Sequence, residues 1–316
     1  MTYWLYRAAA SLLPRMHELI GYPLFDLLGT LAYLLSGSAR GLVSRNMRHI
    51  LAPAARQADV QRYTREAFRN LARNDYDLFH MRGFTKESLR ARMDIAGLDN
   101  LDRALERGKG VLLTSPHFGN TEYLMQVPTL YPYMHFMLLV EKMDDVRLFD
   151  LLRALRAGKV PARVPASLDA GSRDACTGID IAAVDQPLKV IRRLKQNGVV
   201  GIAFDRDVTH NGIDTEFFGQ PAVFPVGAVR LAMTTGAAIV PAYGWREAER
   251  GRFQVHVFPA LELVNTADAE ADVQTNLRRL LAIFEPVIRA RPGQWMAFHE
   301  VWKSAPSAVP AADGSR

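Results

Sequence analysis

The chain has 316 residues, of which 49% are hydrophobic and 23% charged, and it carries a net charge of +6 with a pI near 9.5. This length and composition suit one large domain or two small ones, and they exclude a disordered or fibrous protein. The single cysteine, Cys176, excludes an internal disulfide framework and suits a reducing compartment.

Residues 1–39 form an apolar segment that is almost unbroken between residues 24 and 35. The apolar stretch comes late for a signal peptide, and the sequence that ends it is a poor cleavage site. Pro23 and Asp26 disfavour a helix that spans a bilayer. Two interpretations stay open: a segment embedded in or lying on a membrane, and a helical hairpin within the core.

A basic helical segment is predicted over residues 40–95. Between residues 40 and 75 the sequence has eight arginines and only three acidic residues. The arginines are Arg40, Arg45, Arg48, Arg56, Arg62, Arg65, Arg69 and Arg73. Such positive charge suits an anionic membrane surface or a nucleic acid. No RNA-binding motif or recognition helix accompanies it, so we expect no nucleic-acid partner. An apolar start followed by arginines fits a protein that lies on the cytoplasmic leaflet of a membrane.

Strands and helices alternate along residues 96–303, which predicts an α/β domain with a mixed, largely parallel sheet flanked by helices on both faces. The predicted strands are residues 110–115, 134–140, 199–204, 238–243 and 253–258. The predicted helices are residues 144–157, 187–196, 226–235 and 269–290, the last kinked or broken at Pro286. Residues 159–186 are expected to form a long loop, and residues 304–316 a disordered tail.

The stretch His117-Phe118-Gly119-Asn120-Thr121-Glu122 follows the first of these strands. Its glycine and asparagine favour a turn, and Asn120 or Thr121 can cap a helix whose first turn carries Glu122. His117 and Glu122 can therefore meet across one turn. We expect a neutral imidazole held by a carboxylate, ready to take a proton from a hydroxyl.

A second polar group, Asp205-Arg206-Asp207, follows the predicted strand 199–204. Ligands bind at the carboxyl ends of the strands in sheets of this kind, and we expect His117 and Asp205 to lie at the same rim of the sheet. Two other interpretations stay open. Asp205 could simply cap a turn, or Asp205, Asp207 and His210 could hold the metal ion of a glycosyltransferase.

The order of these motifs resembles the lipid A biosynthesis acyltransferase family, within the lysophospholipid acyltransferase-like group. The ordered set consists of the two stretches above, then Glu216-Phe217-Phe218-Gly219, then Pro225-Val226-Gly227 up to Pro241. The resemblance covers residues 45–303 and is closest to the phosphatidylinositol mannoside acyltransferases. It implies a glycerolphosphate acyltransferase-like fold and an enzyme bound to the cytoplasmic face of the bacterial inner membrane. Such an enzyme moves a fatty acyl group from acyl-CoA or acyl carrier protein to a hydroxyl of a glycolipid or phospholipid.

The resemblance also implies roles for individual residues. The family's H-x4-D/E pair maps onto His117 and Glu122, as the general base and its partner. The basic residue that meets the donor's phosphates falls near Lys142. The substrate-binding candidates are Lys142, Asp205, Arg206, Asp207, Glu216 and Gly219. Backbone N–H groups near Thr121 or Gly227 are expected to stabilise the oxyanion. We expect a monomer, with no metal and no cofactor besides the acyl donor.

Two features depart from the family. Residues 294–302 lack the aromatic-plus-arginine ending of lipid A enzymes, and the loop at residues 159–186 is longer than expected, so the acceptor lipid stays open. The competing hypotheses are a metal-dependent glycosyltransferase built on Asp205 and Asp207, and a non-catalytic lipid-binding protein. The chain has no Gly-x-Ser-x-Gly elbow, which disfavours a covalent hydrolase.

Overall fold

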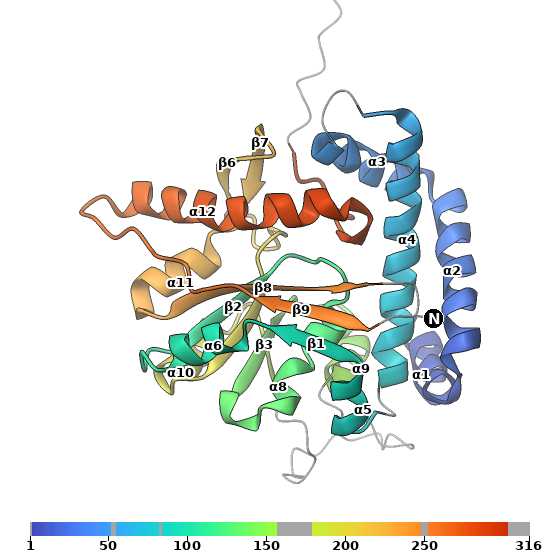
Figure 1. Ribbon diagram of the computed structural model, residues 1–316, viewed down its shortest axis with the longest axis horizontal. Helices are drawn as coiled ribbons and strands as arrows, with labels where there is room; N and C mark the ends of the chain where they lie inside the picture. Colours follow the sequence, from blue (N-terminus) through green and yellow to red (C-terminus); the bar gives the residue numbers. More distant parts are fainter. Residues whose placement is uncertain (1, 52–54, 82–83, 157–178, 248–251, 303–316) are drawn as a thin grey trace, which may run out of the picture.

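The computed structural model describes residues 2–51, 55–81, 84–156, 179–247 and 252–302 (Figure 1). A twisted sheet with helices on both faces forms the α/β part of the protein, and helices α2 and α4 stand side by side at one end of it. The tail expected at residues 304–316, Cys176 and most of the loop expected at residues 159–186 lie outside the described residues.

The sheet has seven strands in the order β1-β9-β8-β2-β5-β3-β4. They are β1 (Met93–Ala96), β2 (Val111–Ser115), β3 (Phe136–Val140), β4 (Asp180–Ala183), β5 (Val199–Ala203), β8 (Ala238–Arg246) and β9 (Phe253–Val257). Neighbouring strands are parallel except β8 and β9, which confirms the predicted mixed, largely parallel sheet. Strand β4 corrects the expectation of a loop throughout residues 159–186. Like β1, it has four residues, which is too short for a clear alternation of apolar and polar positions.

The helices over the sheet are α5 (Lys86–Ala91), α6 (Leu98–Leu105), α7 (Thr121–Leu124), α8 (Val127–Leu130), α9 (Val146–Arg156), α10 (Pro187–Lys195), α11 (Gly227–Thr235) and α12 (Ala269–Ala290). The 3₁₀ turns are η1 (Leu13–Arg15), η3 (Pro132–Met134) and η4 (Pro292–Gln294). Helix α12 runs through Pro286, so the expected break does not occur there. Phe284, Val287 and Ile288 are buried on either side of the proline, and their burial offsets its missing backbone hydrogen bond.

The central strand β2 is buried on both faces. Leu112 packs into the apolar layer that also contains Phe284 of α12, whereas Val111 and Leu113 pack into the opposite layer with Leu101 of α6. Successive side chains of a strand point to opposite faces, so a strand covered on both sides must be apolar throughout. This explains why an unbroken apolar run ends at the polar turn that follows β2.

A separate hairpin, β6 (Ile213–Phe217) and β7 (Gln220–Phe224), projects past α12 (Figure 1). Phe218 and Gly219 form its turn, with φ angles of 52° and 71°. Phe217 is buried against the rings of Trp295 and Trp302, so the hairpin also anchors the end of the chain.

The helical portion at one end of the sheet consists of α1 (Thr2–Leu12), α2 (Glu18–Leu35), α3 (Gly37–Leu51) and α4 (Gln57–His80). Helix α2 lies along α4, and Asp26 of α2 forms ion pairs with Arg69 and Arg73 of α4. Of the 18 residues of α2, Gly21, Tyr22 and Gly29 are buried. One face of α2 therefore contacts the protein, which does not fit a helical hairpin inside the core.

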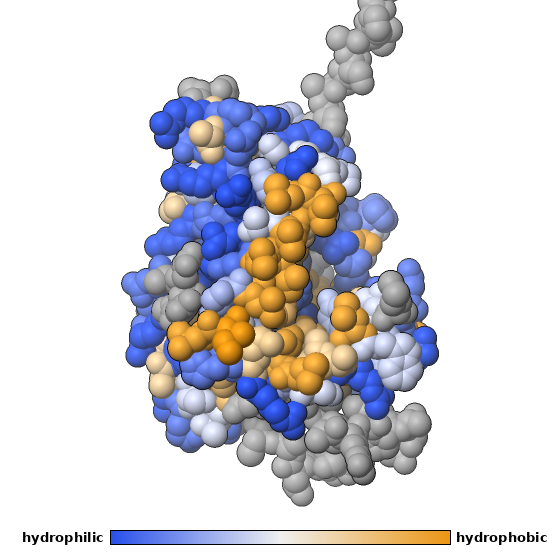
Figure 2. All heavy atoms as spheres, turned by 90° about the vertical axis from the view of Figure 1, so that its right-hand side faces the viewer, coloured by the Kyte–Doolittle hydropathy of each residue, from blue (hydrophilic) through white to orange (hydrophobic). Residues whose placement is uncertain are grey.

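The outer face of α1 and α2 is apolar. Figure 2 shows it as a continuous hydrophobic band bordered by hydrophilic surface. Its exposed side chains are Trp4, Leu5, Leu12, Leu19, Ile20, Leu24, Leu27, Leu28, Leu31, Leu34 and Leu35. By length and composition α2 is also able to cross a membrane, alone in this respect among the helices of the described residues.

Residues 293–302 form a C-terminal strap that returns to the sheet. Asn46 of α3 donates hydrogen bonds from Nδ2 to the carbonyl oxygens of Ala297 (2.8 Å) and His299 (2.9 Å). Asn70 of α4 donates in the same way to Gly293 (2.8 Å). Buried backbone carbonyls need such partners, so side chains of the helical portion fix where the strap lies.

We predict that Asn46→Ala lowers the free energy of unfolding by about 1–3 kcal/mol, because two strap carbonyls lose their donor. Urea denaturation in a mild detergent measures the change. Ser38→Ala, at an exposed position of the same helix, is the control and should change stability by less than about 0.5 kcal/mol. Equal stability of the two variants would contradict the role given to Asn46.

Candidate active site

Two functional side chains meet beyond the carboxyl ends of β2 and β5, which are adjacent and parallel. Ser115 and Ala203 are paired at the ends of these strands, and His117 and Asp205 each come two residues later. His117 Nδ1 lies 2.7 Å from Asp205 Oδ1, and the backbone N–H of His117 donates to Asp205 Oδ2 at 2.9 Å. The structure thus brings together two residues that the sequence predicted to share one rim of the sheet.

The Asp205 carboxylate is buried and fully engaged. Its side chain is 1% exposed, and Trp295 Nε1 donates a third hydrogen bond to it at 2.9 Å. Burial alone raises the pKa of Asp205. The charge of the His117 ring and these hydrogen bonds lower that pKa by more, so it lies well below its usual range. Asp205 is therefore a carboxylate at every physiological pH.

The ionised Asp205 fixes the state of the His117 ring. A carboxylate accepts hydrogen bonds, so His117 Nδ1 carries a proton toward it and Nε2 of the neutral ring keeps its lone pair. Burial lowers the pKa of His117, but the Asp205 carboxylate raises it by more, and the net pKa is raised. The ring is 41% exposed. His117 is thus an oriented and accessible base.

His299 completes the surroundings of Asp205. Its Nε2 lies 2.7 Å from the backbone carbonyl oxygen of Asp205, to which it donates a hydrogen bond. Burial lowers the pKa of His299 by more than the Asp205 carboxylate raises it, so the net pKa is lowered. A neutral His299 therefore supports the main chain of Asp205 without adding a second positive charge to the site.

The turn that carries His117 is clamped on two sides. Gly119 has a φ of +63°, and a Cβ atom there would overlap the carbonyl oxygen of Gly244 in β8. Its N–H donates to the Gln294 carbonyl oxygen (2.6 Å), and its own carbonyl oxygen accepts from Asn74 Nδ2 (2.7 Å). Glycine is required because the backbone is left-handed and no side chain fits against β8.

Glu122 occupies a different position from the one predicted. Its carboxylate accepts hydrogen bonds from Arg156, at 2.8 Å from Nη2 and 3.2 Å from Nε, and its side chain is 9% exposed. The structure therefore does not bring Glu122 to the His117 ring as its carboxylate partner, and Asp205 takes that place. The chain turns into α7 after Gly119, which directs Glu122 toward α9, whereas strand pairing puts Asp205 beside His117.

Asn120 caps α7 as the sequence predicts. Its Oδ1 accepts the N–H groups of Glu122 (3.0 Å) and Tyr123 (3.2 Å). These two N–H groups are consequently engaged and are not available as donors to an oxyanion. The first turn of α7 thus serves to hold Glu122 rather than to form an anion site.

Behind this cap lies a buried ionic network. Asp77 of α4 accepts hydrogen bonds from Asn120 Nδ2 (2.5 Å) and from the hydroxyl of Tyr22 (2.8 Å). Arg246 of β8 forms an ion pair with Asp77 and also donates to the Tyr22 hydroxyl at 3.0 Å. The network connects α2, α4 and β8 to the turn that carries His117.

The remaining predicted site residues form their hydrogen bonds and ion pairs with groups other than the His117 ring. Lys142 is exposed, follows β3 and is 3.4 Å from Asp185. Arg206 is 3.0 Å from Glu141, which precedes Lys142. Lys142 and Arg206 therefore belong to the same rim of the sheet as His117 but contact their own acidic neighbours.

The other three predicted substrate-binding residues are Asp207, Glu216 and Gly219. Asp207 accepts the N–H groups of Asn211 (3.3 Å) and Gly212 (2.8 Å), so it shapes its own loop. Glu216 is exposed on β6, and Gly219 is exposed in the turn of the hairpin. The described residues contain no group of three or more histidine, cysteine, aspartate or glutamate side chains that could hold a metal ion. Asp205, Asp207 and His210 are thus not assembled as a ligand set.

Sequence reasoning missed Trp295, His299 and Arg156. Both strap residues lie in the stretch already noted for its unusual ending, where Trp295 follows Gln294 and His299 precedes Glu300, which was a usable polar signal. Arg156 gave no signal, because an arginine in the last turn of a helix is ordinary dipole compensation.

The chain is similar in sequence to a family of known proteins. A family model described as bacterial lipid A biosynthesis acyltransferase matches residues 1–159 and 173–304. A phosphatidylinositol mannoside acyltransferase of Mycobacterium tuberculosis is 30% identical over 229 residues, which are 72% of this chain and 66% of that protein. One of Mycolicibacterium smegmatis is 28% identical over 246 residues, 78% of this chain and 70% of that protein. The match thus spans just under two thirds of the length of the tuberculosis protein.

We predict that the pKa of the His117 imidazole lies above the ordinary histidine value of about 6.5 and falls below it in Asp205→Asn. The amide keeps the shape of the carboxylate but not the charge that stabilises the imidazolium. An NMR pH titration of the His117 ring protons measures both values. Glu122→Gln is the control and should shift the pKa much less, since Glu122 contacts Arg156. Equal shifts in the two variants would contradict the pairing of His117 with Asp205.

Proposed function

This chain belongs to the bacterial lipid A biosynthesis acyltransferase family, and we propose that it transfers a fatty acyl group from an acyl thioester to a hydroxyl of a lipid acceptor. The observation that carries the proposal is the contact between an exposed His117 ring and a buried, ionised Asp205. The relatives named above support a glycolipid of the phosphatidylinositol mannoside class as the acceptor. Acyl-CoA or acyl carrier protein is the proposed donor.

In the proposed reaction, His117 Nε2 removes the proton of the acceptor hydroxyl as that oxygen attacks the thioester carbonyl carbon. The tetrahedral intermediate then expels the thiolate, which takes the proton back from the imidazolium. Asp205 stabilises the imidazolium between these two steps and holds its Nδ1–H. The histidine ends the cycle neutral, so the transfer requires neither a covalent acyl-enzyme nor a cofactor besides the donor.

Glu122 and Arg156 are proposed as positioning residues. Their buried ion pair joins α7, which begins directly after the His117 turn, to the end of α9. Lys142 and Arg206 are proposed to meet the phosphates of the donor, because both are exposed cations on the rim that carries His117.

The apolar face of α1 and α2 is proposed to attach the enzyme to the cytoplasmic face of the membrane (Figure 2). The Asp26 carboxylate of α2 is bound to two arginines of α4, which would have to separate from it if α2 crossed the bilayer. An orientation in the plane of the interface keeps this ion pair and still buries the exposed leucines in lipid. We therefore propose that α2 lies on the membrane.

We predict that His117→Ala lowers kcat/KM for acyl transfer by about a hundredfold or more, and that Asp205→Asn causes a loss of comparable order. The double variant should be little worse than His117→Ala, because the two residues act as one unit. Incubation with labelled acyl-CoA and membrane lipids, with mass spectrometry of the product, measures the rates. His210→Asn, at an exposed histidine with a φ of 53°, is the control and should keep full activity.

The same assay separates the competing hypotheses. EDTA should leave the activity unchanged, whereas a glycosyltransferase that held a metal at Asp205 and His210 would lose it. Full turnover of His117→Ala at saturating substrates would refute the proposed base. A wild-type protein that binds lipid but forms no product would instead be a lipid-binding protein.

We also predict that a triple Leu27→Glu, Leu31→Glu and Leu34→Glu variant binds lipid vesicles at least about tenfold more weakly, because each change removes an exposed apolar side chain from the α2 face and adds a charge. Vesicle sedimentation measures the partition. Leu188→Glu is the matched control, since this leucine of α10 is 77% exposed but lies on another side of the protein. Unchanged binding of the triple variant would show that another surface attaches the protein.

A further inference from the structure

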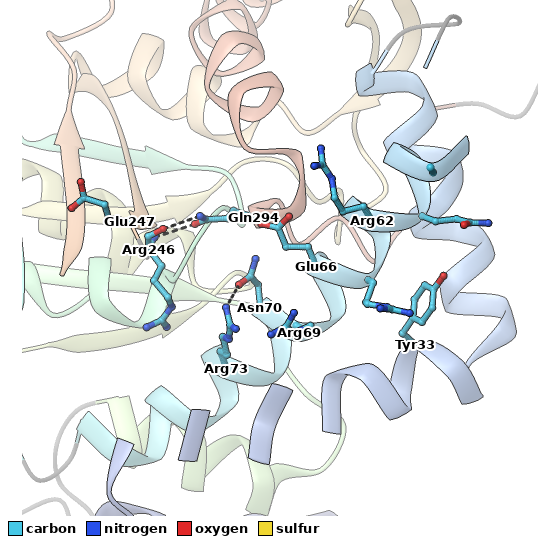
Figure 3. Close-up of a pocket in the computed structure, with 12 residues that line it drawn as sticks. Tyr33, Arg62, Glu66, Arg69, Asn70, Arg73, Arg246, Glu247 and Gln294 are labelled. Carbon is cyan, nitrogen blue, oxygen red and sulfur yellow. Dashed lines mark hydrogen bonds between the residues drawn. The ribbon is translucent and has the colours of Figure 1, made fainter. Parts of the chain in front are cut away.

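An arginine-rich cleft opens beside the apolar face of α2 (Figure 3). It has a volume of about 640 Å³ and lies between α4, the end of β8 and the strap. Five arginines line it, namely Arg62, Arg65, Arg69, Arg73 and Arg246, against the acidic residues Glu66 and Glu247. Asp26 binds Arg69 and Arg73, Asp77 binds Arg246, and Asp59 binds Arg62. Arg65 is the lining arginine that has no ion-pair partner among the described residues.

A second, smaller cleft of about 300 Å³ shares Tyr33 and Gln61 with the first. Arg40 is the charged residue that lines it, and the described residues contribute no carboxylate to its wall. The two clefts meet at Tyr33. Any anion bound there can therefore be reached from both sides by positive charge.

Arg40 and Arg65 both lie over the ring of Tyr33. The guanidinium carbon of Arg40 is 5.5 Å from the ring centroid, and that of Arg65 is 5.6 Å from it. Neither arginine has an ion-pair partner among the described residues. Arg40 uses Nη1 to bind the carbonyl oxygens of Tyr33 and Leu34, both at 3.2 Å. Two guanidinium groups beside one ring, without a carboxylate partner, concentrate positive charge at Tyr33, and an anion bound there would offset it.

This cationic group borders the apolar band. Tyr33 belongs to the last turn of α2, where Leu31, Leu34 and Leu35 are 41%, 54% and 82% exposed. A molecule with an anionic phosphate at Tyr33 can place its acyl chains along these leucines. Asn70 and Gln294 also line the large cleft (Figure 3). Asn70 donates there to the Gly293 carbonyl oxygen, and the Gln294 amide binds the backbone of Arg246.

We propose that Arg40, Arg65 and Tyr33 bind the phosphate of an anionic membrane phospholipid, at a site separate from that of acyl transfer. The acyl chains of this lipid lie against the exposed leucines of α2, and its headgroup enters the large cleft. Arginine suits the role because its guanidinium group binds phosphate oxygens in a bidentate manner. The proposal rests on the proposed attachment of α2 to the membrane and specifies which lipid chemistry α2 meets there.

Titration with a water-soluble, short-chain phosphatidylglycerol below its micelle concentration tests the site. The wild-type protein should bind it saturably at one site, as measured by calorimetry. Arg40→Lys with Arg65→Lys keeps both charges but cannot bind in a bidentate manner, and it should bind at least about tenfold more weakly. Equal binding by this variant would overturn the proposal, because diffuse charge would then account for the affinity.

Vesicles separate this site from attachment in general. On vesicles of phosphatidylcholine alone, Arg40→Gln with Arg65→Gln should bind like the wild type. Added phosphatidylglycerol should strengthen wild-type binding about tenfold or more and strengthen this variant much less. Arg192→Gln with Lys195→Gln removes the same charge from the exposed end of α10 and should keep the wild-type preference. Equal loss in both double variants would overturn the proposal.

The same measurements distinguish failure of the lipid site from failure of the attachment through α2. If the wild type fails to bind neutral vesicles, the proposed attachment through α2 is wrong. If the wild type binds neutral vesicles but Arg40→Gln with Arg65→Gln still prefers vesicles that contain phosphatidylglycerol, the lipid site alone is wrong. Inorganic phosphate at millimolar concentration should not displace the short-chain lipid. Full displacement would identify a site for free phosphate and overturn the assignment to a lipid. Circular dichroism melting of each variant checks that the fold is retained.

Discussion

The buried carboxylate of Asp205 is the constraint on which the site depends. A desolvated charge is tolerated when donors surround it, and these donors come from the turn after β2 and from the C-terminal strap. The strap in turn is fixed by Asn46 and Asn70 of the preceding helices. Helices that contribute no residue to the reaction therefore determine whether His117 has an ionised partner. The helical portion and the sheet are therefore joined by buried hydrogen bonds.

A second buried charge links the helix with the exposed apolar face, α2, to the same turn. Asp77 is fully buried and contacts side chains from α2, β8 and the α7 cap, namely Tyr22, Arg246 and Asn120. Removing one partner of such a pair typically costs about 3–5 kcal/mol, because the other charge stays buried without compensation. Helix α2 is thereby held rigidly relative to His117. A protein attached to lipid through α2 presents the His117 ring at a fixed height and orientation to the membrane surface.

The sequence allowed the main strands, the long helices and the rim that carries His117 and Asp205 to be predicted, because apolar runs and turn residues are local signals. The partner of His117 was not predictable in this way. Asp205 is 88 positions away, and its contact with His117 follows from β5 lying next to β2 in the sheet. The strap was missed for the same reason, since Trp295 reaches Asp205 across 90 positions. The four-residue strands β1 and β4 lacked enough alternation to be recognised.

The geometry gives the five-residue spacing between His117 and Glu122 a structural explanation that differs from direct contact between the two side chains. Five positions take the chain from the end of β2, through a left-handed glycine pressed against β8, into the first turn of α7. The carboxylate at the end of that path binds Arg156 of α9, and it does so while buried. An acid at this position therefore secures the helix that follows the turn, and the turn secures the histidine. The five-residue spacing therefore reflects the path of the turn and the start of α7, which hold His117 in place. The charge that acts on the imidazole comes from Asp205, after the neighbouring strand β5.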